Sequence, residues 1–341
     1  MPTLSEVAAH AGVSVSVASR ALTGDPRARV SPATRERVRH AASELGYRPN
    51  FAGRALRLAR TEVLALVVPG ITNSLVYELI RGVEDEAASA GYTVLLGRAE
   101  DIQPGNPMVD RLLGEGRVDG MILQPVGDMP TSDFEHVFRF AAPIVTIHRE
   151  VEGASSVAVP DLAGTAMATR YLAQRGHHRI GLIGGPPASQ TAARREAGFR
   201  SGMAASGLEI SEEWVLSEGF IDEDGVRGLR RMMALAETPT AVVAANVHAA
   251  VGVLAESRRL GLSVPGDLSV MSVHDSWSAE HTWPPLSSVK LPLYELGREA
   301  VVSLLAEVGG RDAGDRKVVQ APPPMLIERE SVGPPSRHSE V

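Results

Sequence analysis

The residues best suited to chemistry in this chain lie within residues 14 to 22, SVSVASRAL. At helical spacing Ala18, Ala21 and Leu22 fall on one side of this stretch. The opposite side consists of Val15, Ser16, Ser19 and Arg20. Serine hydroxyls and an arginine guanidinium can bind phosphate oxygens and base edges, whereas alanines allow two helices to pack closely. The stretch therefore predicts a helix that faces DNA on one side and protein on the other.

Helix-capping signals predict how this stretch is positioned. Residues 3 to 6, TLSE, form a capping box, so a first helix should begin at Leu4. Gly12 supplies a turn, and Ser14 can cap the second helix, which should run to about Leu22. A third helix should begin at Ser31-Pro32 and run to Gly46. The expected structure is an all-α helix-turn-helix head, residues 1–46, with a small core of its own.

The charge of the chain is divided unevenly. Residues 1–60 carry ten arginines and four acidic residues, a net charge of +6, although the whole chain has a net charge of −7. A basic segment on an acidic body is expected of a nucleic-acid reader. Residues 47–60 hold four of these arginines together with Leu56, and too few apolar groups for a fourth core helix. This segment is predicted to be a linker, or a helix that orders only when bound.

The remainder of the chain alternates short apolar runs with helical segments. These runs are EVLALVVPG, YTVLLGR, DGMILQP, APIVTIHR, SSVAVPD, RIGLIGG, TAVVAAN and LSVMSVHD. Apolar runs separated by helices predict buried parallel strands in doubly wound α/β sheets. About 270 residues is too long for one ordinary sheet, so two lobes with a ligand cleft between them are expected.

Several other classes of protein lack support in the sequence. No apolar run has the ~20 residues of a membrane span, and no secretory signal is visible, so a cytoplasmic protein without membrane contact is expected. There are no cysteines and no phosphate-loop or nucleophile-elbow motif. His177-His178 has no further ligands at metal-binding spacing and is interpreted as a solvated turn. We expect neither an enzyme nor a cofactor or metal.

The segments LSEVAAHAGVSVSVASRAL, VSPATRERV and ELGYRPNFAGRALR resemble the lactose repressor (LacI/GalR) family of bacterial transcription regulators. The resemblance extends over the whole chain, including YLAQRGHHRIGLIGG, LGLSVPGDLSV and LIERES in a body similar to periplasmic sugar-binding proteins. It implies a regulator that binds operator DNA through the second helix in the major groove. It also implies that residues 47–60 are a hinge helix whose leucine enters the minor groove.

Carried over residue by residue, the resemblance assigns Val15 and Ser16 as the specificity pair and Arg20 as a reader of guanine. The implied DNA-binding residues are Ser14, Val15, Ser16, Ser19, Arg20, Asn50, Arg54, Leu56 and Arg57. Val17 stands where the family usually has threonine, which puts one phosphate contact in doubt.

The same carry-over implies a cleft for a sugar or sugar-derived effector. The implied effector-binding residues are Leu75, Val76, His148, Asp161, Arg195, Phe220, Asn246 and His274. Val247 and His274 replace family carboxylates, which usually accept hydrogen bonds from sugar hydroxyls. Three interpretations stay open: an anionic effector such as a sugar phosphate or carboxylate, weakened effector control, or drift without functional consequence.

These observations predict a homodimeric repressor that binds a palindromic operator under control of a small molecule, with a tetramer left open. A corepressor-dependent regulator, an activator, and a solute receptor without DNA function remain alternatives. The expected domains are the head, the hinge at residues 47–60, the body at 61–330 and a tail at 331–341. Within the body, lobe 1 is expected at about 61–160 and 291–330, and lobe 2 at about 161–290.

Overall fold

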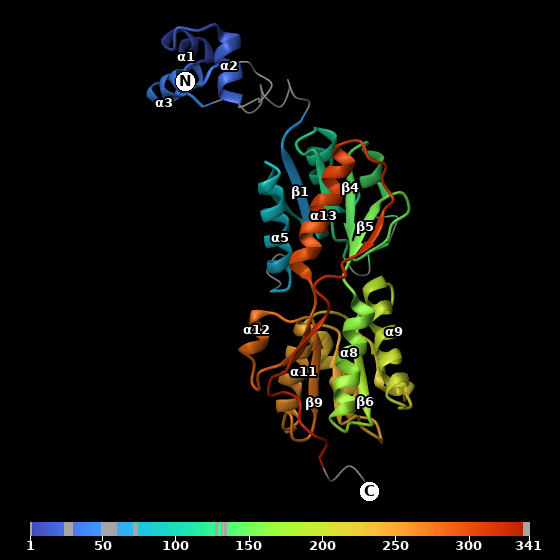
Figure 1. Cartoon of the computed structure of the whole chain (residues 1–341). Coiled ribbons are helices and arrows are strands. Elements are labelled where there is room, and N and C mark those ends of the chain that lie inside the picture. The colour runs from blue at the N-terminus through green and yellow to red at the C-terminus, as the bar shows by residue number, and fades with distance from the viewer. Residues whose placement is uncertain are drawn as a thin grey trace. The chain divides into compact units, whose positions relative to one another are not determined.

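The structure is a computed structural model that describes residues 2–23, 30–48, 60–70, 74–126, 129–130, 132 and 135–336. The chain forms two compact units, a head at Met1–Thr61 and a body at Glu62–Val341 (Figure 1). Among the described residues, no helix is long and apolar enough to cross a membrane.

The described residues of the head form three helices: α1 Leu4–His10, α2 Val15–Thr23 and α3 Pro32–Glu44. The predicted capping box is present, since the Thr3 hydroxyl accepts from the Glu6 N–H and the Glu6 carboxylate accepts from the Thr3 N–H. The predicted caps of the other two helices also form, because Ser14 Oγ accepts from the Val17 N–H and Ser31 Oγ from the Thr34 N–H. The three-helix prediction is confirmed.

Small side chains fill the core of the head. Ala18 and Ala21 of α2 are fully buried, together with Val7 of α1 and Val38 of α3. The other buried residues of this core are Ala8, Ala11, Ala41 and Ala42. A core of alanines and valines requires short distances between helix axes, so each position leaves little room for a larger side chain.

The described part of the body forms two six-stranded sheets, one in each lobe (Figure 1). In strand order, the lobe 1 sheet consists of β11 Arg316–Val318, β5 Ser155–Ala158, β4 Ile144–Ile147, β3 Gly120–Leu123, β1 Val63–Val68 and β2 Thr93–Arg98. The lobe 2 sheet consists of β12 Met325–Ile327, β10 Ser287–Lys290, β9 Ser269–Val273, β8 Ala241–Ala244, β6 Ile180–Gly184 and β7 Val215–Ser217. All neighbouring strands are parallel except β10 and β12. This confirms the predicted α/β fold with two sheets.

Three closely packed helix pairs accompany these sheets. The pairs are α5 Val76–Ser89 with α13 Leu293–Val308, α8 Asp161–Gln174 with α9 Gln190–Ala205, and α10 Asp222–Met233 with α11 Val247–Arg259. Glycines permit the close approach: a Cβ at Gly82 would lie 1.9 Å from the carbonyl oxygen of Tyr294. Shorter helical segments are η1 Ala99–Ile102, α6 Pro107–Val109, the π-helical turn η2 Asp110–Gly114, η3 Val137–Arg139, η4 Glu212–Trp214 and α12 Trp277–Glu280.

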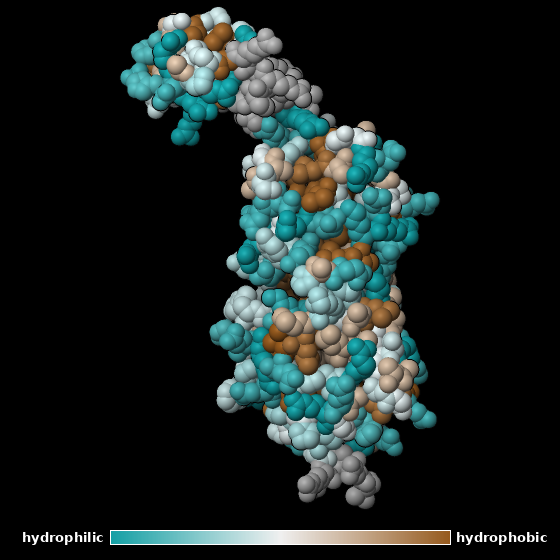
Figure 2. Space-filling model, viewed as in Figure 1, coloured by the Kyte–Doolittle hydropathy of each residue, from teal (hydrophilic) through white to brown (hydrophobic). Residues whose placement is uncertain are grey.

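Apolar side chains also reach the surface of the body, and Figure 2 shows apolar areas on both lobes. The edge strand β2 exposes Leu95 and Leu96, and α5 exposes Tyr77. In lobe 2, Trp277 is 66% exposed and Trp283 is 87% exposed. Large apolar groups at a sheet edge are unusual for a surface that stays in water.

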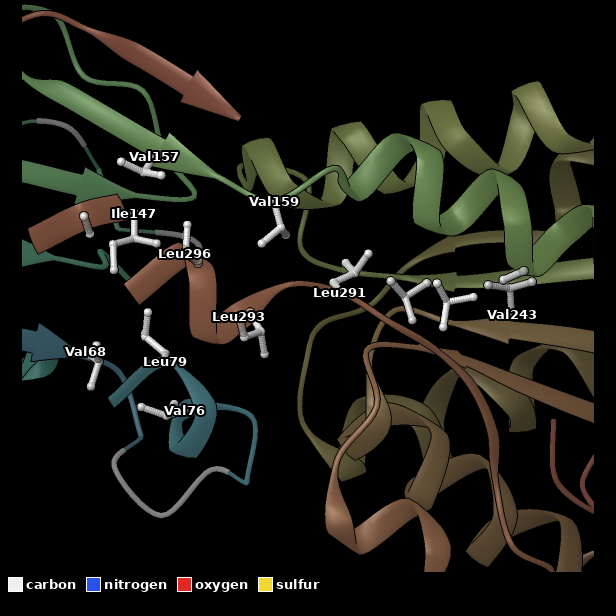
Figure 3. Packing of buried hydrophobic residues seen from close by; sticks show 14 of the residues in the cluster. Val68, Val76, Leu79, Ile147, Val157, Val159, Val243, Leu291, Leu293 and Leu296 are labelled. Carbon is white, nitrogen blue, oxygen red and sulfur yellow. The ribbon is translucent and has the colours of Figure 1, made fainter. Parts of the chain in front are cut away.

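The lobes share one continuous core at the segments where the chain crosses between them. Val159 lies on the first crossing, and Leu291 and Leu293 on the second, all buried between side chains of both lobes (Figure 3). The chain crosses a third time between β11 and β12 (Figure 1).

This third crossing corrects one predicted boundary, because residues 291–330 were assigned as a whole to lobe 1. β12 pairs antiparallel with β10, so Met325–Ile327 belong to the lobe 2 sheet. The chain that follows is held there too, since Ser331 Oγ donates to the Val270 carbonyl and accepts from the Ser287 N–H. A strand of three residues has too short a pattern to be assigned to a sheet from sequence.

Candidate DNA-binding surface and effector cleft

The structure presents the predicted DNA-reading side chains on the outside of the head. Val15 is 45% exposed, and Ser14, Ser16 and Arg20 are exposed, whereas Ser19 is half-buried. Arg20 lies along its own helix, with Nε donating to the Ser16 carbonyl at 3.2 Å. The four remaining predicted contacts, Asn50, Arg54, Leu56 and Arg57, lie outside the described residues.

A cleft of about 360 Å³ lies in the body and is lined by both lobes. Seven of the eight predicted effector residues line it: Leu75, Val76, His148, Arg195, Phe220, Asn246 and His274. A volume of this size is typical of small-molecule sites. Asp161 is not part of the lining, since its side chain is fully buried and paired with two arginines.

Asp161 is the centre of a buried charged cluster. One carboxylate oxygen accepts from Arg195 Nε at 2.9 Å, and the other accepts from Arg194 Nε at 3.1 Å and Nη2 at 3.0 Å. Burial is the largest single effect and raises the pKa of Asp161, but the neighbouring charges, that of Arg195 first, together outweigh it and hold the pKa below its ordinary value. Arg194 Nη2 also donates to the His148 carbonyl of lobe 1. The cluster therefore connects the two lobes directly behind the cleft.

Two histidines line the cleft from opposite lobes, His148 after β4 and His274 after β9. Both have positive φ angles, +62° and +67°, which are uncommon for residues with a side chain and occur often at functional sites. Burial lowers the pKa of His148 to about 4. Burial and then the charge of Arg195 lower the pKa of His274 well below its ordinary value. At neutral pH these imidazoles add no positive charge, so any anion preference must come from arginine.

Phe220 and Asn246 both line the cleft but differ in the contacts that their side chains make within the protein. The Phe220 ring faces the Arg195 guanidinium, with 5.7 Å between the guanidinium carbon and the ring centre. Asn246 caps α11: its Oδ1 accepts from the Ala249 N–H, and its Nδ2 donates to the Phe220 carbonyl. Both polar atoms of the Asn246 side chain are therefore hydrogen-bonded within the protein, and the residue forms part of the wall of the cleft.

Several polar lining residues were not among the predicted effector residues. Glu100, Gln124 and Arg149 lie just after β2, β3 and β4 respectively, and Gln190 begins α9. Ligands of open α/β sheets bind at the carboxyl ends of the strands, so position in the chain could have identified the first three. Arg149 and Arg195 against Glu100 leave the lining with a net charge of +1.

The solvated-turn interpretation of His177-His178 is wrong for His177. This ring is 1% exposed and contacts the Thr240 hydroxyl at 2.9 Å, the Ser269 hydroxyl at 3.0 Å and the Gly333 carbonyl at 2.9 Å. His177 therefore fastens the carboxyl-terminal segment to lobe 2. These three partners, two hydroxyls and one carbonyl, come from distant segments, which a local pattern does not reveal.

A helix-turn-helix head on a two-lobed body with a ligand-sized cleft is the architecture of a DNA-binding regulator. Residues 3–50 match the family model described as bacterial regulatory proteins, lacI family, and residues 169–332 match the periplasmic binding protein-like domain.

Individual relatives agree with this class. The HTH-type transcriptional repressor CytR of Escherichia coli K12 is 32% identical over 317 residues, which cover 92% of this chain and 91% of that protein. A LacI family transcriptional regulator from Mycobacterium smegmatis is 36% identical with a TM-score of 0.75, and the match covers 80% of this chain and 100% of that chain. The transcriptional regulator CelR in its cellobiose complex is 31% identical with a TM-score of 0.70, covering 97% and 100%. The chain belongs to the LacI family of bacterial regulatory proteins, which are DNA-binding regulators and not enzymes.

Proposed function

We propose that this chain is a repressor that binds a palindromic operator as a homodimer and is controlled by a small molecule in the cleft. The observation that carries the proposal is the outer side of α2, where exposed Val15, Ser16 and Arg20 stand on a fully buried base of Ala18 and Ala21. A helix held in this way can enter the major groove without changing its own packing. Ser14 and Ser19 would bind phosphates, as would the predicted hinge residues Asn50, Arg54 and Arg57, with Leu56 at the operator centre.

The effector in this proposal is a polar molecule of the sugar class. The relative CelR was solved as a cellobiose complex, and the cleft of this chain combines Phe220 with arginine, glutamine and histidine side chains. The net charge of +1 in the lining favours an effector with one negative charge over a neutral one. Binding between two lobes favours one arrangement of the body over another, and that preference changes operator affinity.

The decisive experiment is selection and sequencing of genomic DNA bound by the purified protein at ~150 mM salt, where binding to phosphates alone is weak. A short palindrome would support a dimeric regulator, and the genes beside it would indicate candidate effectors. Selection repeated with each candidate effector separates an inducer, which releases the DNA, from a corepressor. Failure to enrich any sequence in either condition would contradict the proposal and favour the solute receptor.

Replacing Arg20 with alanine should lower operator affinity by ~1–3 kcal/mol and relax base preference at one position of each half-site, because a bidentate contact to guanine is lost. Competition binding against a set of operators with single base changes measures both the loss of affinity and the change in base preference. Arg57→Ala is the matched comparison, and it should weaken binding to all sequences alike. Equal losses of specific and random DNA binding by Arg20→Ala would exclude base reading by this residue.

The exposed apolar groups of the body support the dimer. Leu96, on the edge strand β2, is 47% exposed, and replacing it with glutamate should shift the protein toward monomer by about tenfold or more in dissociation constant. Analytical ultracentrifugation measures the shift. Leu162→Glu, at an equally exposed leucine of α8, is the control. Unchanged assembly of the Leu96 variant would place the dimer interface elsewhere.

A further inference from the structure

A second pocket lies in the body where the chain crosses between the lobes. It has a volume of about 500 Å³, which is within the range of small-molecule sites and larger than the effector cleft. The second crossing lines it with Leu291 and Pro292, and the third crossing lines it with Pro322–Pro324. We call it the crossing pocket. None of the eight predicted effector residues is in its lining, so this space is distinct from the cleft.

Both lobes contribute side chains to the crossing pocket. Arg81 of α5 and Glu295 of α13 come from lobe 1, whereas Lys290 of β10 and Met325 of β12 come from lobe 2. Leu293, which begins α13 after the second crossing, lines both the crossing pocket and the effector cleft (Figure 3). A molecule in the crossing pocket therefore contacts both lobes and favours one arrangement of them over another.

Most of the charged groups in this lining already have partners. Glu78 and Arg81 form an ion pair at 3.2 Å within α5. Asp275 pairs with Arg329 at 2.7 Å and also accepts from the Ser288 hydroxyl. Each of these pairs is neutral as a unit, so neither of them attracts a charged ligand strongly.

Lys290 and Glu295 are the remaining charged residues of the lining. Neither forms an ion pair or a side-chain hydrogen bond with a described residue, and they do not pair with each other. Arg298, one turn further along α13, pairs with Glu86 at 2.8 Å instead. The crossing pocket therefore presents one positive and one negative charge, each without a partner of opposite sign among the described residues.

The rest of the lining suits an apolar group. Proline has no backbone N–H, so Pro292 and Pro322–Pro324 supply no main-chain donor. The Tyr294 hydroxyl is used elsewhere, since it donates to Asp85 at 2.8 Å. The hydroxyls of a sugar thus find few hydrogen-bonding partners here, whereas an apolar side chain can pack against the prolines and Met325, which is 52% exposed.

We propose that the crossing pocket binds an α-amino acid with an apolar side chain, as a second ligand separate from the effector. The carboxylate of the amino acid accepts from the Lys290 ammonium, and its own ammonium donates to the Glu295 carboxylate. A zwitterion supplies one charge of each sign and so matches both unpaired groups. An apolar acid matches Lys290 alone and brings a second carboxylate near Glu295, and an apolar amine has the converse fault.

The test compares L-phenylalanine with two analogues that each lack one charge. These are 3-phenylpropanoate, which has no ammonium, and 2-phenylethylamine, which has no carboxylate. Isothermal titration calorimetry with the full-length protein at pH 7 measures the three dissociation constants. Wild type should bind L-phenylalanine at least about tenfold more tightly than either analogue, because each analogue loses one charge-assisted hydrogen bond.

Two variants assign each charge of the ligand to its partner. Lys290→Met keeps a long side chain without its charge, and it should weaken L-phenylalanine and 3-phenylpropanoate about tenfold while leaving 2-phenylethylamine unchanged. Glu295→Gln should weaken L-phenylalanine and 2-phenylethylamine but not 3-phenylpropanoate. Glu213→Gln removes an exposed carboxylate outside the pocket and should behave as wild type. A general loss of folding cannot produce opposite analogue preferences in the first two variants.

Three outcomes would overturn the proposal. These are no binding of L-phenylalanine, equal binding of L-phenylalanine and an analogue, and wild-type binding of L-phenylalanine by Lys290→Met or Glu295→Gln. The calorimetry needs no operator, so its outcome is independent of the DNA selection described above. A recovered palindrome together with any of the three outcomes rejects the amino-acid site alone, whereas the absence of any palindrome rejects the proposed function.

Discussion

Replacing Asp161 with asparagine should lower the free energy of unfolding of the body by ~3–5 kcal/mol, because the buried Arg195 and the half-buried Arg194 would lose their shared carboxylate. Arg195 is only 5% exposed at its side chain and has no room to turn toward solvent. Since Arg194 also donates to the His148 carbonyl, the loss should loosen the connection between the lobes and weaken effector binding. Urea unfolding followed by tryptophan fluorescence measures the free energy of unfolding of the body, because all three tryptophans lie in the body.

Glu115→Gln is the matched control for Asp161→Asn. Glu115 pairs with Arg117 at 2.6 Å, but both side chains are more than half exposed, so this change should cost less than ~1 kcal/mol. The pKa of Asp161 is held below its ordinary value, so its stabilisation is present above pH ~4 and is lost as the pH falls through the folded-state value. The difference between wild type and Asp161→Asn should therefore be constant near pH 7 and narrow in acid. Equal losses of unfolding free energy in the two variants would show that the buried ion pair stabilises the body no more than an exposed one.

The sequence allowed the head to be predicted almost residue by residue because its signals are local. A capping box, a serine cap and a serine-proline cap each act within four residues, and all three form as expected. The eight apolar runs likewise correspond to strands β1 to β6, β8 and β9. Burial on both faces leaves a continuous apolar pattern in these strands, except in the exposed edge strand β2.

What sequence reasoning missed depends on contacts between distant segments. The four strands outside the predicted runs are short, since β10 has four residues and β7, β11 and β12 have three each. Pairing with a neighbouring strand defines them more than their own composition does. His177 appeared solvated because its partners come from Thr240, Ser269 and Gly333. An anionic effector was one of three interpretations open from the sequence, and the sequence does not reveal that burial lowers the pKa of both cleft histidines and leaves them neutral.

Replacing Ala18 with leucine should weaken operator binding by destabilising the head while the body stays intact. Ala18 is fully buried among side chains of all three helices, and a leucine would add three carbon atoms where no space exists. Overpacking typically costs ~1–3 kcal/mol, and a domain of under 50 residues with a core of alanines and valines has little stability in reserve. Operator affinity should fall by at least about tenfold.

Ala9→Leu is the matched control, because it makes the same substitution at an exposed position of α1 with almost the same helix propensity. This variant should bind operator as wild type does. Tryptophan fluorescence of both variants should give the wild-type unfolding midpoint for the body, since the head contains no tryptophan. Operator binding retained by Ala18→Leu would mean that the helices of the head can move apart without losing their DNA-binding surface. The buried alanines would then not be what holds Val15, Ser16 and Arg20 in position.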